Sequence, residues 1–255
     1  MACASVHTAP AARATDSSAP LVVTDASLEW LKWIAVAAMV LDHINWFWFA
    51  AGGSPRSTGH AWMNEAGRVA LPLFAFAFGL NLHRVLADAH SAARLRRMGL
   101  RLGLAGVIAQ CLYWPLRGYF FPLNVMFLFA IALGACVLYE RGERLNSRTW
   151  QGVTLAVALV GGFVVEYWWF GLMVVFSAYA WAARPTTTRL AALVLSVILL
   201  AILNNSPWPL AALPIVYCLA RATLAPRRIP GLLHAFYPAH LAALLVASLA
   251  FGRLA

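Results

Sequence analysis

Charged residues are scarce in this sequence. Only 11% of its 255 residues are Asp, Glu, Lys or Arg, whereas 62% are hydrophobic. Soluble domains contain about 25% charged and about 45–50% apolar residues, so the composition excludes an ordinary water-soluble domain. Acidic residues are the rarest, and the formal net charge is +10. Because no basic segment interleaved with aromatic residues accompanies this charge, we expect no nucleic-acid partner.

Cysteine is scarce too, and familiar catalytic motifs are missing. The four Cys residues form neither a disulfide framework nor a CxxC metal pattern. The sequence has no HExxH, Walker, dinucleotide-binding or GxSxG motif, and we expect no bound metal. Residues 1–27 lack the apolar core of about 7–15 residues that defines a signal peptide. We therefore expect a mobile tail over residues 1–27 and a membrane domain over residues 28–255.

Long apolar runs occupy the rest of the chain. A hydrocarbon core of about 30 Å requires about 20 apolar residues per crossing helix. Two runs are too long for one crossing and are divided by breaker and polar residues, at Gly161, Gly162 and Glu166 and at 204–207. The pattern predicts an all-α, polytopic helical bundle embedded in membrane lipid. Nine transmembrane helices are expected, at about 28–50, 66–87, 98–116, 121–139, 150–165, 167–183, 188–204, 208–222 and 232–251.

Arginine residues alternate between the two ends of the predicted helices. The connections after the second, fourth, sixth and eighth runs contain Arg84, Arg94, Arg96, Arg97, Arg101, Arg141, Arg144, Arg148, Arg184, Arg189, Arg221, Arg227 and Arg228. The alternate connections and the C-terminal end contain only Arg56, Arg117 and Arg253. Because Lys and Arg concentrate in cytoplasmic loops, the N-terminus is predicted to be cytoplasmic and the C-terminus external.

The first apolar run, LKWIAVAAMVLDHINWFWF, contains Asp42 and His43 side by side. A charged group at the centre of a spanning helix costs about 3 kcal/mol, and such groups usually mark a functional site. Lys32 precedes His43 by eleven residues, which places both within about 20° on one helix face and about 16 Å apart. Asp42 lies about 100° from His43 around the helix, so the two side chains do not face each other.

Asp42 therefore needs a partner from another helix. Arg68, at the start of the second run, is the best candidate, and Asn45 shares the Asp42 face at i+3. Two interpretations of the pair stay open: an ion pair that only fixes helix packing, and a charged pair that takes part in chemistry. The same alternative of a packing role applies to His43.

Further polar residues lie inside other apolar runs. Any one of them alone is expected to form an interhelical hydrogen bond, worth about 0.6 kcal/mol on average. Together with Asp42, His43 and Arg68 they predict a polar cavity, because such groups face the interior of a bundle. They are Asn81, Gln110, Asn124, Glu166, Tyr167, Asn204 and His240.

Five segments resemble a known family. LKWIAVAAMVLDHIN, AGRVALPLFAFAFGLNLHR, RLGLAGVIAQCLYW, NVMFLFA and FYPAHLAAL resemble, in that order, motifs of the TraX family, membrane proteins that N-acetylate F-type conjugative pilin. The match extends from about Lys32 to His240. Separately, Lys32 and His43 resemble the motif of the wider transmembrane acyltransferase superfamily, in which a basic residue is followed after ten residues by histidine.

The resemblance implies an N-acetyltransferase of the bacterial inner membrane. It would transfer an acetyl group from cytoplasmic acetyl-CoA, as co-substrate, to an amine at the outer side, on pilin or another protein N-terminus. It implies catalytic roles for His43, Asp42 and Arg68. It implies substrate or cofactor contacts for Lys32, Asn45, Asn81, Gln110, Asn124, Tyr237 and His240.

Elementary chemistry supports a base at His43. An amine must be neutral to attack a thioester, and an α-amino group has a pKa of about 8, so an imidazole with a pKa of about 6.5 can accept its proton. A proton-coupled transporter and a non-catalytic membrane assembly partner are the alternatives. An assembly partner would not need Lys32 and His43 on the same helix face.

The alternation of arginine makes a topological prediction. A reporter fused after Ala255 should lie on the external side of the membrane, and one fused at the N-terminus on the cytoplasmic side. With a cytoplasmic N-terminus the first run enters the membrane at about Leu28, which predicts that Asp42 and His43 lie in its outer half. A C-terminal reporter found in the cytoplasm would remove one crossing and would contradict this depth.

Overall fold

The computed structural model describes residues 23–50, 54–57, 59–220, 222–223, 226–227, 229 and 231–252. Within these ranges the regular structure is helical, with one isolated β-bridge between Leu123 and Val165. The prediction of an all-α chain is confirmed. Most of the expected N-terminal tail, residues 1–22, lies outside the described residues, as do Arg221, Arg228 and Arg253 of the arginine pattern.

The helices follow the predicted apolar runs. Their bounds are α1 Asp25–Ile44, continued by the π-helix η1 Asn45–Phe49; η2 Pro55–Ser57; α2 Ala61–Gly67; α3 Ala70–Leu86; α4 Ala92–Arg117; α5 Val125–Arg144; α6 Arg148–Val164; α7 Trp168–Ala183; α8 Thr187–Leu203; η3 Trp208–Ala211; α9 Ala212–Leu219; and α10 Leu232–Ala250. The second predicted run, 66–87, differs most from the observed helices, because it contains the end of α2 and a break before α3.

Helix α1 begins three residues before the expected start of the membrane domain because its N-terminus is capped. Thr24 Oγ1 accepts a hydrogen bond from the backbone N–H of Ser27 at 3.1 Å, and the Ser27 hydroxyl accepts one from the backbone N–H of Thr24 at 3.3 Å. Such a reciprocal pair satisfies two backbone donors of a first turn. Leu28, Leu31 and Ala35 then begin the buried face that continues to Asp42 and His43.

The predicted division between the fifth and sixth runs is confirmed at Glu166. Helix α6 ends at Val164 and α7 begins at Trp168, with a left-handed backbone at Tyr167 (φ 61°) and Trp168 (φ 50°). The backbone N–H of Glu166 donates to the carbonyl of Leu123 at 2.8 Å. Gly161 and Gly162, expected to mark this division, instead lie inside α6.

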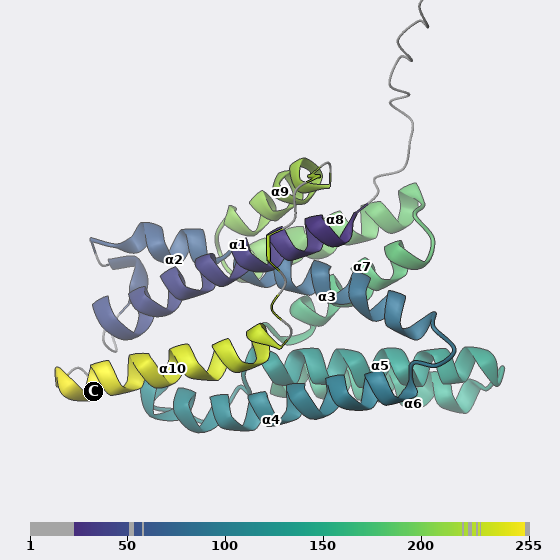
Figure 1. Ribbon diagram of the computed structural model, residues 1–255, viewed down its shortest axis with the longest axis horizontal. Helices are drawn as coiled ribbons and strands as arrows, with labels where there is room; N and C mark the ends of the chain where they lie inside the picture. Colours follow the sequence, from purple (N-terminus) through teal and green to yellow (C-terminus); the bar gives the residue numbers. More distant parts are fainter. Residues whose placement is uncertain are drawn as a thin grey trace, which may run out of the picture.

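The helices form two packed groups (Figure 1). On one side α5 packs against α4 and α6, and α10 lies along α4; on the other, α3 packs against α1 and α7, and α7 against α8. The groups meet through contacts of α6 with α7 and of α5 with α3 and α7. Figure 1 shows the α3–α4, α5–α6 and α7–α8 connections at the same end of the bundle, so the arginines of these connections gather there.

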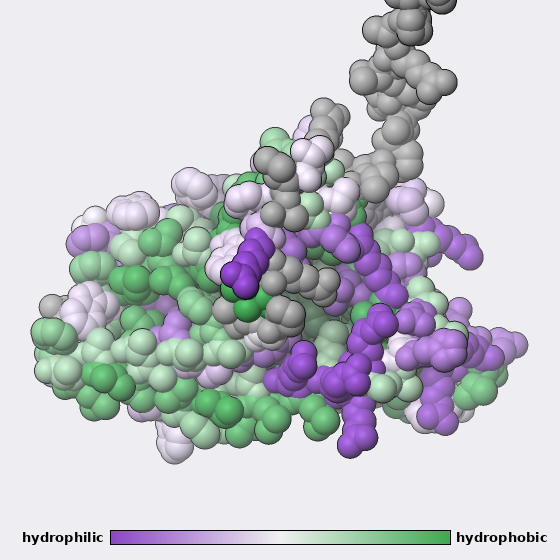
Figure 2. Space-filling view, in the orientation of Figure 1, coloured by the Kyte–Doolittle hydropathy of each residue, from purple (hydrophilic) through white to green (hydrophobic). Residues whose placement is uncertain are grey.

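The surface is largely apolar on the helices that enclose the bundle. Phe163 of α6 is 71% exposed and Leu104 of α4 is 64% exposed. Large apolar side chains of α8 and α10 are exposed as well. Figure 2 shows this apolar surface along α4 and α10, with hydrophilic side chains gathered toward the end that carries the arginine-rich connections. Soluble monomers rarely expose apolar surface on this scale.

Three helical segments within the described residues are long and apolar enough to cross a membrane: Ala61–Leu86, Val125–Arg144 and Leu233–Ala250. Three shorter apolar segments are Trp168–Ala183, Thr187–Leu203 and Trp208–Leu219. The Ala61–Leu86 segment combines α2 and α3. The number of crossings, nine, stays a prediction.

The close packing of α3 on α7 generates a prediction about Gly79. A Cβ atom at Gly79 would lie 2.6 Å from the carbonyl oxygen of Val175 and 3.0 Å from the backbone nitrogen of Tyr179. Backbone atoms cannot rotate away, so Gly79→Ala should force the helices apart and lower stability by about 1–3 kcal/mol. Thermal unfolding of the purified protein in detergent measures this effect.

Gly134 of α5 provides the matched control, because a Cβ atom there would meet nothing within 4 Å. Gly134→Ala should leave stability unchanged or raise it by up to about 1 kcal/mol, through the higher helix propensity of alanine. Equal effects of the two substitutions would contradict the close approach of α3 and α7.

Candidate active site

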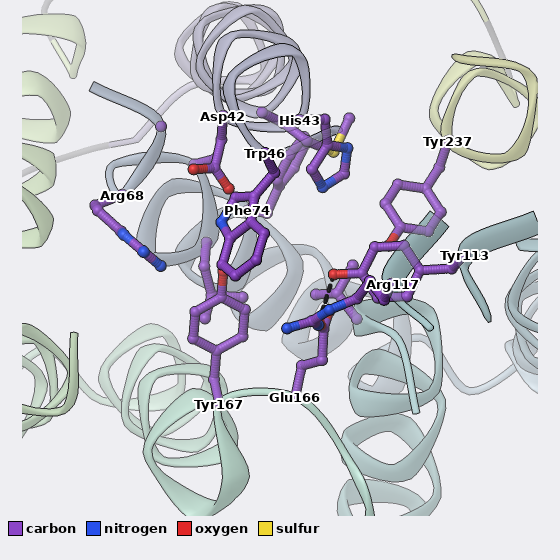
Figure 3. Close-up of a pocket in the computed structure, with 15 residues that line it drawn as sticks. Asp42, His43, Trp46, Arg68, Phe74, Tyr113, Arg117, Glu166, Tyr167 and Tyr237 are labelled. Carbon is purple, nitrogen blue, oxygen red and sulfur yellow. Dashed lines mark hydrogen bonds and ion pairs between the residues drawn. The ribbon is translucent and has the colours of Figure 1, made fainter. Parts of the chain in front are cut away.

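A polar cavity of about 180 Å³ lies between the two groups of helices (Figure 3). Helices α1, α3, α4, α5 and α10 contribute to its wall, together with the α2–α3 and α6–α7 junctions. It is lined by Met39, Asp42, His43, Trp46, Gly67, Arg68, Ala70, Leu71, Phe74, Tyr113, Arg117, Val125, Glu166, Tyr167 and Tyr237. The predicted polar cavity is therefore present. It holds two carboxylates, two guanidiniums and one imidazole among aromatic side chains.

Asp42 is linked to Arg68 through an asparagine that the sequence did not single out. Asn64 Nδ2 donates to Asp42 Oδ1 at 2.6 Å, and Asn64 Oδ1 accepts from Arg68 Nη2 at 3.3 Å. Arg68 Nη1 donates to Asn204 Oδ1 at 3.0 Å. The amide thus turns its donor to the carboxylate and its acceptor to the guanidinium, as the charges require.

The predicted direct ion pair between Asp42 and Arg68 is not formed, and this part of the prediction is corrected. The reason is the end of α2, where Asn64 precedes Arg68 by one helical turn and lies between the two charges. Gly67 allows α2 to approach this closely, because a Cβ atom there would lie 2.3 Å from Asp42 Cβ. The Nε of Arg68 is buried and has no hydrogen-bond partner among the described residues.

His43 contacts a second histidine, His240, which belongs to α10. His43 Nδ1 lies 2.6 Å from His240 Nε2, and the two rings are nearly parallel, at 5°. His240 Nδ1 lies 3.0 Å from the backbone oxygen of Phe236, one turn earlier on α10. Because Nδ1 of His43 is engaged, Nε2 is the nitrogen that remains for a substrate in the cavity.

Aromatic rings surround His43. Its ring centroid lies 5.5 Å from that of Phe47 and 6.2 Å from those of Tyr113 and Tyr237. Tyr237, which the resemblance to the family identified, lines the cavity and is only 2% exposed. These rings exclude water from the imidazole.

Arg117, Tyr113 and Glu166 form a hydrogen-bonded cluster on the far wall. Arg117 Nη1 donates to the Tyr113 hydroxyl at 2.8 Å and to Glu166 Oε1, and the Tyr113 hydroxyl donates to Glu166 Oε1 at 2.6 Å. The Arg117 guanidinium also lies over the rings of Trp46 and Tyr119, at 5.4 and 4.6 Å. Figure 3 shows it pointing into the cavity.

The assignment of Arg117 to an external loop is corrected, since Arg117 ends α4 and its side chain is only 15% exposed. A sequence signal existed, because Tyr113 and Arg117 are four residues apart on one helix face, as are Asn64 and Arg68. The charge of Arg117 therefore belongs to the cavity wall and is no signal of membrane topology.

Gln110 and Asn124 do not line the cavity. Gln110 Oε1 accepts hydrogen bonds from the backbone N and from Nδ2 of Asn124, both at 2.8 Å, while Asn124 Nδ2 also donates to the Gly106 carbonyl. Asn124 Oδ1 accepts from the backbone N–H of Met126 and caps α5. These amides fasten the start of α5 to α4.

Three further predicted residues also lie outside the cavity wall. Asn45 is fully buried in the π-helical turn after His43. Asn81 is on α3, seven residues beyond the cavity residue Phe74 and therefore about 10 Å along the helix. Lys32 forms an ion pair with Glu29 at 2.8 Å, near the start of α1. Their expected contacts with substrate stay predictions.

The arrangement is suited to a proton transfer followed by stabilisation of negative charge. The imidazole of His43 lines a cavity of about 180 Å³, and two guanidiniums lie on the walls of the same cavity. Fixed cationic donors in a dry site stabilise a developing oxyanion. No group of three or more His, Cys, Asp or Glu side chains suited to a metal ion occurs in the described part of the chain.

Comparisons with known proteins find similar sequences. A family model described as TraX protein matches residues 27–248. A protein of Escherichia coli named Protein TraX is 32% identical over 233 residues, which are 86% of this chain and 86% of that protein. Protein TraX of Escherichia coli strain K12 is 34% identical over 103 residues, 40% of this chain and 36% of that protein. No solved structure matches. The family match includes every residue that lines the cavity.

The bridge through Asn64 generates a prediction about coupling. Asp42→Asn and Arg68→Gln should each lower stability by about 3–5 kcal/mol, because each leaves a buried charge without its counter-charge. The double variant should lose less than the sum of the two. The difference between that sum and the loss in the double variant is the coupling of the two charges. Replacing Asn64 with Leu should reduce this coupling, since the Asn64 amide bonds both Asp42 and Arg68. Thermal unfolding in detergent of all eight combinations measures it.

Arg56 and Glu65 provide the control cycle. Their ion pair of 3.3 Å lies nearby, but the side chains are 37% and 24% exposed, so their coupling should be below about 1 kcal/mol. Additive losses for Asp42 and Arg68 would refute the bridged pair.

Proposed function

Because this chain belongs to the TraX family, we propose that it is a membrane-embedded N-acetyltransferase. It transfers an acetyl group from acetyl-CoA on the cytoplasmic side to an amine at the outer side. The acceptor is an exposed protein N-terminus, of pilin or a similar protein. The observation that carries the proposal is the cavity position of His43, whose Nε2 is the nitrogen left free to act as a base.

The proposed reaction is a direct acyl transfer. The amine nitrogen forms a bond to the thioester carbonyl carbon, and the proton of the amine passes to Nε2 of His43. The tetrahedral intermediate then collapses, and its bond from carbon to sulfur breaks. The thiolate of CoA leaves and takes the proton from His43, so an amide and a free thiol are formed and the imidazole returns to its starting state.

Arg117 and Arg68 are the candidate donors to the oxyanion of the intermediate. Both guanidiniums line the cavity, and the Nε atom of each is buried without a partner among the described residues. Glu166 and Tyr113, which also line the cavity, hold the Arg117 guanidinium in place through hydrogen bonds. Removing one oxyanion donor typically lowers kcat by about 10²–10³.

The apolar exterior of the bundle supports a membrane location for this reaction. The apolar outer surface and the three long apolar helices suit a lipid environment. With the arginine-rich connections in the cytoplasm, the Asp42 and His43 end of α1 lies in the outer half, where the acceptor arrives. Lys32, near the inner end of α1, is then placed to attract the phosphates of CoA, and Glu29 holds its side chain.

Substitution of His43 and Lys32 should separate chemistry from binding. His43→Ala should lower turnover by about 10²–10⁴ while acetyl-CoA binding is retained, because only the base is lost. Lys32→Ala should weaken acetyl-CoA binding, and the loss should shrink as salt rises, because partly exposed charges are screened. Release of free thiol and the mass of a peptide amine acceptor, with purified protein in detergent, measure both effects.

His90→Ala is the matched control, since the imidazole of His90 is 96% exposed in the α3–α4 connection. Its turnover should equal that of the unaltered protein. Undiminished turnover in His43→Ala would overturn the assignment of the base. Function in cells retained by His43→Ala, without any acetylated acceptor, would instead favour a non-catalytic assembly partner.

A further inference from the structure

His240 touches the proposed base but does not itself line the cavity. It reaches His43 from α10, which packs along α4 and also contacts α1. Its ring lies between the His43 ring and the ring of Phe236, nearly parallel to both, with centroids 4.9 and 5.2 Å away. The ring of His240 also contacts that of Tyr237, with centroids 5.4 Å apart, and its hydrogen bond to a side chain that lines the cavity is with His43.

The hydrogen bonds of His240 determine where its proton lies. The backbone oxygen of Phe236 can only accept, so Nδ1 of His240, 3.0 Å away, must donate. In a neutral imidazole with hydrogen on Nδ1, Nε2 carries the lone pair. The 2.6 Å contact with His43 then requires that Nδ1 of His43 donates to Nε2 of His240. Consequently Nε2 of His43 carries a lone pair and can accept a proton.

The surroundings of His43 favour a histidine pair that carries no positive charge. The rings of Phe47, Tyr113 and Tyr237 pack around His43, and His43 is only 8% exposed. The carboxylate of Glu166 on the facing wall is already bonded to Arg117 and Tyr113. The carboxylate of Asp42 is bonded to Asn64. A charge buried without a partner is strongly unfavourable.

We propose that His240 is a positioning residue that holds His43 in the tautomer with hydrogen on Nδ1, so that Nε2 is always available as the base. This inference rests on the proposed function for its catalytic meaning, but the tautomer is a property of the protein alone. A histidine without this contact can carry its hydrogen on Nε2, and in that form it cannot accept the proton of the amine at Nε2.

An imidazole suits this role in an apolar bundle. In serine proteases a buried carboxylate orients the histidine and stabilises its charged form. Here the acceptor is uncharged, so no buried negative charge has to be compensated while the site is at rest. When His43 takes up a proton, the lone pair of His240 still accepts its Nδ1 hydrogen and stabilises the cation.

Nitrogen NMR of the whole protein in detergent, labelled with ¹⁵N-histidine, tests the tautomer. The His43 resonances are assigned by their loss in His43→Ala. At neutral pH we expect His43 with hydrogen on Nδ1 and a scalar coupling across the bond from Nδ1 to Nε2 of His240. Hydrogen on Nε2 of His43 in the unaltered protein would overturn the proposal, and the His43→Ala variant serves only to assign the resonances.

Two substitutions test the consequence. His240→Phe keeps an aromatic ring but removes the acceptor, so His43 should gain the Nε2–H form and kcat should fall by roughly 10–100-fold, with an unchanged KM for acetyl-CoA. His240→Gln can place its amide oxygen near the position of Nε2, so it should keep the Nδ1–H form and most of kcat. His90→Phe, at the exposed histidine, should change neither.

The two readouts separate this inference from the proposed function. Absence of acetyl transfer in every protein, with the expected tautomer in the unaltered one, would refute the acetyltransferase and keep the placement of the proton. Normal kcat in His240→Phe, or a loss in His240→Gln as large as in His240→Phe, would overturn the positioning role even where acetyl transfer is observed.

Discussion

Two adjacent polar side chains on α1, Asp42 and His43, must both be satisfied inside an apolar bundle, and they leave the helix about 100° apart. A buried polar group without a partner costs several kcal/mol, so each needs its own partner from a different direction. Asn64, with Arg68 behind it, comes from α2, whereas His240 comes from α10. Asp42 and His43 both line the cavity, and their partners contact them from two other helices.

Irregular backbone is concentrated at the wall of this cavity. Helix α1 changes to a π-helix two residues after His43, α2 breaks from α3 at Arg68, and α6 breaks from α7 at Glu166. Within a membrane, non-helical backbone is tolerated only where it is buried in protein or lines a cavity. π-helical turns are likewise frequent at functional sites. The breaks therefore mark the site as clearly as the polar side chains do.

Residues outside the cavity still determine its shape. Gln110 binds both the backbone and the side chain of Asn124, which fixes the segment before α5. The preceding residue, Leu123, accepts the backbone N–H of Glu166 and donates its own to Val164. Through this β-bridge the amides of Gln110 and Asn124 hold the α6–α7 junction, and with it the carboxylate that anchors Arg117. Their role in the fold is one of support.

The sequence by itself determined the all-α architecture, the division of the apolar runs, and a polar cavity that contains Asp42, His43 and Arg68. These follow from apolar length, breaker residues and the cost of a buried charge, which are local properties of the chain. Only the tertiary structure decided that Asn64 separates Asp42 from Arg68, that Arg117 belongs to the site, and that His240 faces His43 from 197 residues away. Such partners depend on which helices pack together and at what rotation, and no periodicity within one helix specifies that.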